Sequence, residues 1–412
     1  MIHKFDFVRS ARFFYLVAVA FLIPVQKPLF SLNVIILDYV NAVFMVFFVC
    51  YFVLNRTLQF RLVIPVLVIL FASLISMINS ENVTLNLVTL TQELYLYTFF
   101  IVVSNVIQTE REMRIVVGSL FLSAAAFSIP LLQELAENFT ARASGSFTDD
   151  NGAAAFLGAA AFLTYYAFSK PWRFVKPVFL AMILTAVFAT KSLSGALAYI
   201  TGTVAIFVLF WRRTGPRSRV KLFAAGVVFT FVLAAVFQQA ANLHNYLDRL
   251  PNSTSGRTIL WKTGIETFLH NPLGIGIGPA RFKEVVIITE ANHRKELHSD
   301  YLSFLVERGI FGLAGLLLVI AAIARSLARS LRNQTFQPEL LWILGLVGMF
   351  IFTLVDALNH EMLHNRHVWV IYALIVAQER ISAKRKQKEI DGATLTRDAD
   401  ETRALETSLA PV

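Results

Sequence analysis

The sequence predicts an all-α polytopic membrane protein with about twelve transmembrane helices and one long loop that contains short helices. Three observations support this fold class. Hydrophobic residues make up 56% of the 412 residues, which is too apolar for a soluble globular chain of this length. Apolar stretches recur along the chain, and many approach the roughly 20 residues that a transmembrane helix needs. Only one segment between these stretches is long, at residues 241–298.

The predicted spans follow one another with short connections. The seventh and twelfth are short, so ten or eleven crossings are an alternative to twelve. Proline and glycine occur within several spans, for example Pro65, Pro130 and Gly202, and membrane helices tolerate both residue types. The approximate bounds are 12–30, 33–54, 62–80, 84–107, 113–135, 151–169, 174–190, 192–211, 220–240, 299–324, 338–358 and 366–379.

Positive charges predict the orientation of the chain. With the N-terminus in the cytoplasm, most of the 37 Lys and Arg residues fall in inner segments, as cytoplasmic loops require. Both termini are therefore predicted inside. The chain divides into an N-terminal bundle of about nine spans (1–240), the long outer loop (241–298), about three C-terminal spans (299–380) and a tail (381–412). The tail is charged and lacks aromatic residues, so we predict a disordered cytoplasmic end.

Composition excludes several classes of function. The net charge of +10 follows from membrane topology and does not indicate a nucleic-acid partner. A single cysteine, Cys50, excludes a disulfide within the chain. Asp149, Asp150 and Asn151 could hold a divalent cation, but acids and Asn at a helix start usually cap the helix. The sequence has no Cys cluster, and we predict neither a metal site nor a cofactor.

Charged residues within the predicted spans concentrate in their outer halves, and Lys191 lies at an outer turn. Ionisable groups at one depth of a membrane protein suggest a water-filled cavity that opens outward. For any one residue, a role in helix packing or an interfacial position is the alternative. The residues concerned are Asp38, Glu93, Glu307, Arg308 and Asp356.

Among the arginines of outer segments, where topology disfavours them, Arg142, Arg257 and Arg281 are of most interest. The planar guanidinium matches the oxygens of a phosphate group. Arg257 begins an amphipathic helix predicted over residues 256–270, and the amides of a helix start also favour an anion. We therefore predict an anionic, lipid-linked ligand such as a pyrophosphate, with a head-group or carboxylate contact as the alternative for each arginine.

His298 lies where the long loop meets the tenth span, and it is the candidate base. An imidazole with an ordinary pKa near 6.5 suits proton transfer at neutral pH. His293 is the nearest rival to this assignment.

Three motifs in order resemble the O-antigen ligase and polymerase family of bacterial inner-membrane proteins. The motifs are Arg142-x-x-Gly145-Ser146-Phe147-x-x-x-Asn151, then Gly256-Arg257-x-x-x-Trp261 with Asn271-Pro272-Leu273-Gly274-Ile275-Gly276, and His298-x-x-Tyr301-Leu302-x-x-Leu305-x-Glu307-x-Gly309-x-x-Gly312-Leu313. The layout of twelve spans with one large loop before the last three is also similar to this family.

The resemblance implies an enzyme of the inner membrane that transfers a glycan at the periplasmic face, which is where the long loop would then lie. The donor would be a polyprenyl (undecaprenyl) pyrophosphate glycan held in the membrane lipid. The acceptor would be the lipid A core for a ligase, or another carrier-linked repeat unit for a polymerase. The family's reaction is considered metal-independent, and no cofactor is implied.

The resemblance also implies roles for individual residues. Arg142 and Arg257 would hold the diphosphate, and His298 would activate the acceptor. Further substrate-binding candidates are Arg281, Lys191, Tyr301, Glu307 and Asn151. The sequence departs from the family at Thr190-Lys191-Ser192-Leu193-Ser194-Gly195, where many members carry a Ser-Arg-Gly-like element. Lys191 would supply a point charge there in place of the arginine fork.

Two other functions compete with the enzyme. A transporter or flippase of lipid-linked oligosaccharide would also need cations in a polar cavity, but it should carry polar groups through its whole depth and show related halves. The charges here concentrate on the outer side, and the sequence shows no evident repeat. A non-catalytic membrane scaffold explains neither the charges nor the long loop.

Overall fold

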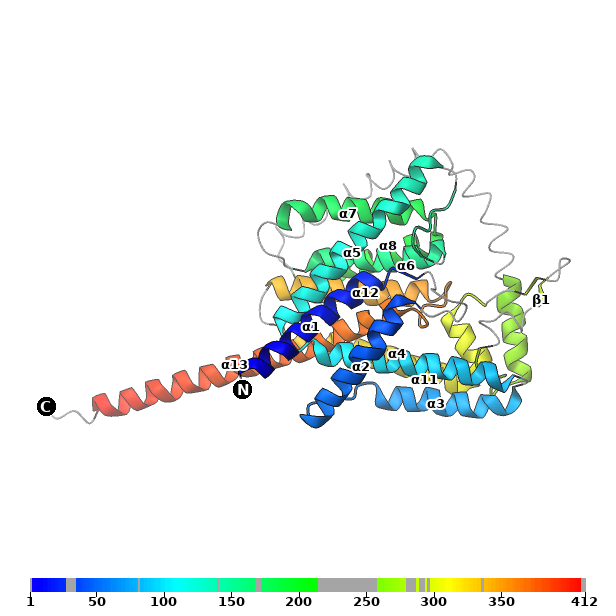
Figure 1. The fold of residues 1–412 in the computed structure, drawn as a ribbon. Coiled ribbons are helices and arrows are strands. Elements are labelled where there is room, and N and C mark those ends of the chain that lie inside the picture. Colours follow the sequence, from blue (N-terminus) through cyan, green and yellow to red (C-terminus); the bar gives the residue numbers. More distant parts are fainter. Residues whose placement is uncertain are drawn as a thin grey trace.

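A computed structural model gives the arrangement of the chain (Figure 1). It describes residues 2–26, 35–80, 82–138, 141–147, 149–166, 172–213, 258–278, 287–288, 293–294, 297–334 and 337–408. Nearly all of these residues are helical. The strands among them are two-residue pieces, β1 (Ile287–Ile288) and β2 (His293–Arg294), which pair antiparallel.

A helix occupies the position of each predicted span except the ninth, 220–240, which lies outside the described residues. A further helix covers residues 258–270, close to the amphipathic helix predicted over 256–270. The named elements are α1 (Ile2–Leu22), α2 (Ile36–Leu54), α3 (Val63–Ser76), η1 (Met77–Asn79), α4 (Val83–Val106), α5 (Glu110–Glu137), α6 (Asp150–Ala161), η2 (Phe162–Tyr165), α7 (Trp172–Ala189), α8 (Leu193–Arg213), α11 (Asp300–Asn333), α12 (Gln337–Asp356) and α13 (Arg366–Ser408).

Six of the described helices are long and apolar enough to cross a membrane: α2, α4, α5, α8, α11 and α12. Two shorter apolar helical stretches cover Val63–Asn79 and Phe174–Ala189. The 12 residues of α6 extend only about 18 Å at 1.5 Å per residue, which is less than the roughly 30 Å of a bilayer core. The all-helical membrane class is confirmed, and the number of twelve crossings stays a prediction.

The helices pack as one bundle around an apolar core. α12 lies against α8, α11 against α3, and α13 against both α4 and α11. Aromatic side chains fill much of the interior, including the fully buried Phe48, Phe99 and Phe352. Many other large apolar side chains are exposed on the outside of the bundle, such as Ile64 and Val43, as expected where helices face lipid.

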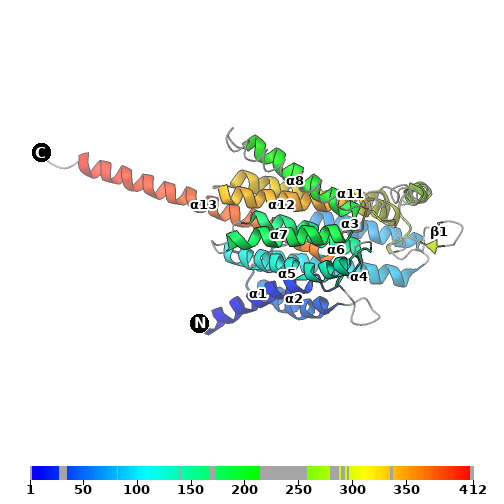
Figure 2. The same cartoon turned by 90° about the horizontal axis from the view of Figure 1, so that it is seen from above.

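The C-terminal tail differs from the disordered end that we predicted. α13 continues as a helix to Ser408, and its last part projects from the bundle at the end opposite to β1 (Figures 1 and 2). The physical reason is that residues 381–408 are rich in Ala, Lys, Arg and Glu and contain no proline, so their helix propensity is high. Low hydrophobicity alone was a poor guide to disorder here.

Candidate active site

Contacts between helices bring most of the predicted site residues to one end of the bundle. A Cβ on Gly195 of α8 would lie 2.9 Å from Ala154 of α6, so these two helices begin at the same end. A Cβ on Gly158 of α6 would meet the Phe352 ring, which places the end of α12 there as well. The Asp300 amide donates to the Ala357 carbonyl at 3.0 Å, so α11 also begins there. The segments that carry Arg142, Lys191 and His298 thus share one end.

Arg142 lies in the α5–α6 loop and is held from three sides. Its Nε lies 2.5 Å from Asp150 Oδ2 and donates to the Thr190 carbonyl at 3.0 Å. Its Nη2 donates to Asn151 Oδ1 at 3.0 Å, and that oxygen also accepts a hydrogen bond from Ser192 Oγ at 3.0 Å. The Arg142 side chain is about one third exposed.

Asp150 opens α6 on the loop side, before the span predicted from residue 151. Burial raises the pKa of the Asp150 carboxyl, and the Arg142 guanidinium acts in the opposite direction. The Asp149 carboxylate accepts the Gly152 amide at 2.7 Å and so caps α6. Both acids have structural partners, which agrees with the capping interpretation of this motif.

Two predicted site residues have left-handed backbone, which is uncommon outside glycine. Lys191 has φ +52°, and its amide donates to the Phe188 carbonyl at 2.9 Å in the turn between α7 and α8. His298 has φ +51° and is half-buried directly before α11. Such conformations cost on the order of 1–3 kcal/mol each and persist only where neighbouring contacts impose them.

The contacts that hold the His298 turn come from the first residues of α11. The Asp300 carboxylate is buried and accepts the Met362 amide at 2.9 Å and the Leu363 amide at 3.1 Å. Tyr301 Oη donates to the Leu354 carbonyl at 3.1 Å, and thus the Tyr301 hydroxyl has a structural partner. Sequence reasoning missed Asp300, because an acid at a helix start normally serves its own helix.

Residues 271–278, here called the glycine strap, follow helix 258–270 and lie against α11. The Gly274 backbone has φ +92°, and a Cβ there would lie 2.3 Å from the Glu307 carbonyl oxygen. Gly309, inside α11, has φ +64° and its Cβ would lie 2.2 Å from the Pro272 carbonyl oxygen. Both positions therefore require glycine, which gives a structural reason for these glycines of the motifs.

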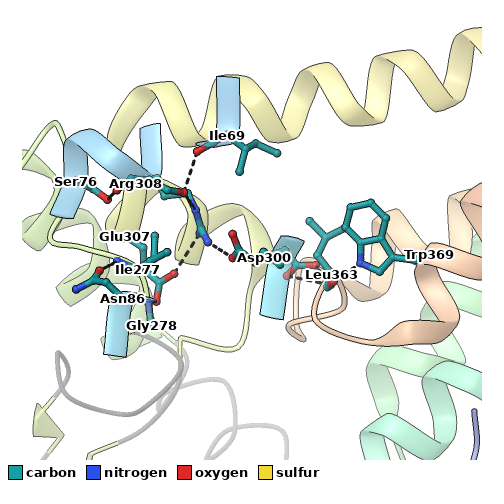
Figure 3. Close-up of polar contacts among 12 residues, drawn as sticks. Ile69, Ser76, Asn86, Ile277, Gly278, Asp300, Glu307, Arg308, Leu363 and Trp369 are labelled. Atoms are coloured by element: carbon teal, nitrogen blue, oxygen red, sulfur yellow. Dashed lines mark hydrogen bonds and ion pairs between the residues drawn. The ribbon is translucent and has the colours of Figure 1, made fainter. Parts of the chain in front are cut away.

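Glu307 holds the strap by its carboxylate. Oε1 accepts the Gly278 amide at 2.9 Å, and Oε2 lies 3.2 Å from Arg308 Nη1 (Figure 3). Arg308 is fully buried, pairs also with Glu93, and donates from Nε to Ser73 Oγ at 3.1 Å. Glu307 is 2% exposed, so the structure assigns its carboxylate to packing rather than to a surface open to substrate.

Other charges in the outer halves of the spans also form pairs. Asp38 binds Arg366 in a bidentate arrangement, with distances of 2.7 and 2.6 Å. Asp356 lies 4.0 Å from His360. Together with the Glu93–Arg308 pair, these contacts give most of the predicted cavity residues a structural partner. A small apolar pocket between α3, α4, α11 and α13 includes Glu93 in its wall.

Helix 258–270 packs directly on the segment that carries His298. Leu260 of its first turn, Leu297 and Val306 form one buried apolar cluster. A Cβ on Gly264 would lie 3.0 Å from the Leu302 side chain, which shows how closely the two backbones approach. Arg257, the predicted cation, directly precedes this helix, and Leu297 directly precedes His298, the predicted base. The helix after Arg257 therefore contacts the residues next to His298.

Some predicted residues lie outside what the structure describes. Arg257 and Arg281 are not among the described residues, and the side chain of His293 in β2 is not described either. Across the described segments, no group of three or more His, Cys, Asp or Glu side chains has the arrangement of a metal site.

Part of the chain matches a known protein family. Residues 177–317 match the family model described as O-antigen ligase. The chain thus contains an O-antigen ligase region that covers about a third of its length. The matched region runs from α7 into α11 and includes Lys191, Arg257, Arg281, His298, Tyr301 and Glu307, whereas Arg142 and Asn151 precede it. The resemblance seen in the motifs is thereby confirmed.

The match to the O-antigen ligase model supports glycan transfer of the ligase or polymerase type. It also agrees with the apolar helices, which indicate a multi-pass membrane protein. A comparison with curated proteins gives no match.

Proposed function

We propose that this protein is a periplasmic-face glycosyltransferase of the bacterial inner membrane. It moves a glycan from an undecaprenyl pyrophosphate carrier to an acceptor, with both of its own termini in the cytoplasm. The observation that carries the proposal is the family match, which includes His298 and the helix that directly follows Arg257. The packing of Leu260 with Leu297 supports it, because Arg257 and His298 flank these two residues in sequence.

The reaction exchanges one bond at the anomeric carbon for another. The bond between that carbon and the carrier's phosphate oxygen breaks, and its electron pair stays on the departing undecaprenyl pyrophosphate. The acceptor hydroxyl oxygen forms the new bond to the carbon, and its proton passes to the His298 imidazole. Negative charge grows on the leaving group, so fixed cations aimed at it stabilise the transition state.

Arg142 and Arg257 are the proposed cations, with Arg281 and Lys191 as further contacts. The surroundings of Arg142 support its part in this. The Asn151 amide oxygen and the Thr190 carbonyl hold the guanidinium in place, and the side chain is about one third exposed. A guanidinium that is already oriented loses less conformational freedom when it binds an anion.

Reconstitution in vesicles tests the function. The purified protein is supplied with an undecaprenyl pyrophosphate glycan, and either lipid A core or a second carrier-linked unit is offered as the acceptor. Transfer to lipid A core identifies a ligase, and elongation of the carrier-linked glycan identifies a polymerase. Movement of the donor across the bilayer without transfer would favour a flippase and contradict the proposal.

Single substitutions test the assigned roles in the same vesicles. His298→Ala removes the base and should lower the transfer rate by about 10²–10⁴-fold. Arg142→Ala should raise the KM for the donor as well, because it removes a ground-state contact with the pyrophosphate. Lys388→Ala is the control, since this exposed residue lies in the projecting part of α13. Wild-type transfer by His298→Ala would refute the assignment of the base.

Removal of divalent cations tests the reaction class. We expect full activity after treatment with a chelator, because Asp149 and Asp150 are engaged in the cap of α6 and the pair with Arg142. A strict requirement for Mg²⁺ would instead direct attention to these two acids as ligands.

A further inference from the structure

Asp300 is a buried carboxylate two residues after His298, and the proposed reaction gives it no part. Asp300 is 2% exposed. A buried charge is costly unless it is hydrogen-bonded. Asp300 stands in the first turn of α11, where an acid usually caps the helix. Its contacts differ from that pattern, because no side-chain bond caps the start of α11.

The partners of Asp300 lie across the bundle, in the connection between α12 and α13. Its carboxylate accepts the amides of Met362 and Leu363, at 2.9 and 3.1 Å, and Figure 3 shows it beside Leu363. Its own amide donates to the Ala357 carbonyl at 3.0 Å. One residue therefore joins both ends of this connection to the start of α11.

Two neighbouring side chains reinforce the same contact. Ser303 Oγ donates to Glu361 Oε1 at 2.7 Å, with both residues buried, and Tyr301 Oη donates to the Leu354 carbonyl. On the other side, Leu297 is fully buried in the cluster with Leu260. His298 thus lies between two fixed points, in a left-handed conformation that is uncommon for residues other than glycine.

We propose that Asp300 is a positioning residue that fastens the His298 turn to the α12–α13 connection and thereby sets where the imidazole meets the acceptor. This role rests on the proposed function of His298 as the base. It acts through the backbone, so Asp300 itself touches neither donor nor acceptor. A displacement of about 1 Å in a reacting group can cost about 100-fold in rate, which makes such a contact matter for catalysis.

The role predicts a specific kinetic signature for Asp300→Asn. The substitution keeps the size of the side chain, but it replaces one of the two oxygens near the Leu363 amide by an NH₂ group. The Leu363 N–H then faces a second donor, which weakens its bond to residue 300. We expect kcat to fall by about 10–100-fold, while the KM for the donor changes by less than about threefold. Hydrogen exchange at residues 357–366 and 297–304 should rise, and exchange in α8 should not.

Glu339→Gln is the matched control. Glu339 is also a buried carboxylate, and it accepts from Ser382 Oγ at 2.6 Å near the start of α12, about 30 Å from the end that meets Asp300. Its substitution should lower thermal stability without changing kcat per folded molecule. If Asp300→Asn is too unstable to purify, Ser303→Ala is the second variant. It removes the hydrogen bond from Ser303 to Glu361 and should give a smaller fall in kcat, again with an unchanged KM for the donor.

The measurements are made on the full chain in vesicles, with the folded fraction of each variant determined in parallel. Wild-type kcat per folded molecule for Asp300→Asn, together with faster exchange at residues 357–366, would overturn the positioning role and leave only a structural one. A wild-type protein that transfers no glycan would overturn the proposed function itself. The exchange data report the Asp300 contact in either case, so the two failures are distinguishable.

Discussion

The Glu307 carboxylate accepts a hydrogen bond from the Gly278 amide at 2.9 Å, and its other oxygen lies 3.2 Å from the Arg308 guanidinium. A single side chain of α11 therefore holds the end of the glycine strap and neutralises a buried cation. Charges inside a membrane bundle are costly unless they are paired. The strap connects helix 258–270 to this contact, so the placement of that helix against Leu297 depends on the charge balance around Arg308.

Replacement of Arg308 by methionine should destabilise the protein strongly. The substitution leaves Glu93 and Glu307 without their shared cation in a buried site, which costs about 3–5 kcal/mol in the free energy of unfolding. The thermal unfolding midpoint of the detergent-solubilised protein measures the effect. Lys262→Met is the control, because the Lys262–Glu266 pair is exposed and exposed pairs contribute about 0–1 kcal/mol.

A triple variant separates the charge imbalance from the loss of packing. Glu93→Gln and Glu307→Gln combined with Arg308→Met remove all three charges, and much of the lost stability should return. Equal midpoints for Arg308→Met and the wild type would show that this network contributes nothing to stability.

Gly309→Ala should break the fit between the strap and α11. Gly309 has φ +64° and ψ −161°, a backbone region open essentially to glycine alone, and an added Cβ would lie 2.2 Å from the Pro272 carbonyl oxygen. We expect a loss of about 3 kcal/mol or more, with faster proteolysis within residues 258–278. Leu317→Ala is a suitable comparison, because this residue of the same helix is 50% exposed. Unchanged proteolysis in Gly309→Ala would contradict the close contact.

The sequence predicted the helices well because the length of an apolar run fixes a span locally. Helices occur at each described position that was predicted, and the structure brings Arg142 and Asn151 of the first motif beside the Thr190 carbonyl, next to Lys191. Those residues lie beside helix starts and turns, where local sequence signals are strong. For the tail, low hydrophobicity predicted disorder, whereas α13 extends as a helix to Ser408.

The partners of buried charges were not predictable from local sequence. Asp300 bonds to amides 62 and 63 residues away, and Arg308 reaches Glu93 and Ser73 in two other helices. Nothing near Glu307 in the sequence indicates that its carboxylate binds a backbone amide of the preceding loop. Polar residues within spans can serve packing or substrate, and only the tertiary contacts distinguish the two uses.

Asp150→Asn should strengthen the binding of a pyrophosphate ligand at Arg142. The Asp150 carboxylate lies 2.5 Å from the guanidinium and competes for it with any other anion. Asn151 and the Thr190 carbonyl would still hold Arg142 in place after the substitution. We expect the Kd for undecaprenyl pyrophosphate to fall by about 3–10-fold at low salt, and the gain to shrink as salt screens the charges.

Asp149→Asn provides the comparison for that binding measurement. Asn remains a good N-cap for α6, so the fold should keep its stability while one nearby negative charge is lost. Its effect on the Kd should be smaller than that of Asp150→Asn. A weaker affinity in Asp150→Asn would mean that Asp150 orients Arg142 more than it competes for it.

Labelling of introduced cysteines should establish the orientation of the bundle. Cys50 is the single native cysteine and is first replaced by serine. Lys262→Cys, on the exposed face of helix 258–270, should react with an impermeant maleimide in cells whose periplasm is accessible. Lys388→Cys, on the projecting part of α13, should react only after the inner membrane is opened. The reverse pattern would place His298 on the cytoplasmic side, where an acceptor of periplasmic glycan transfer could not reach it.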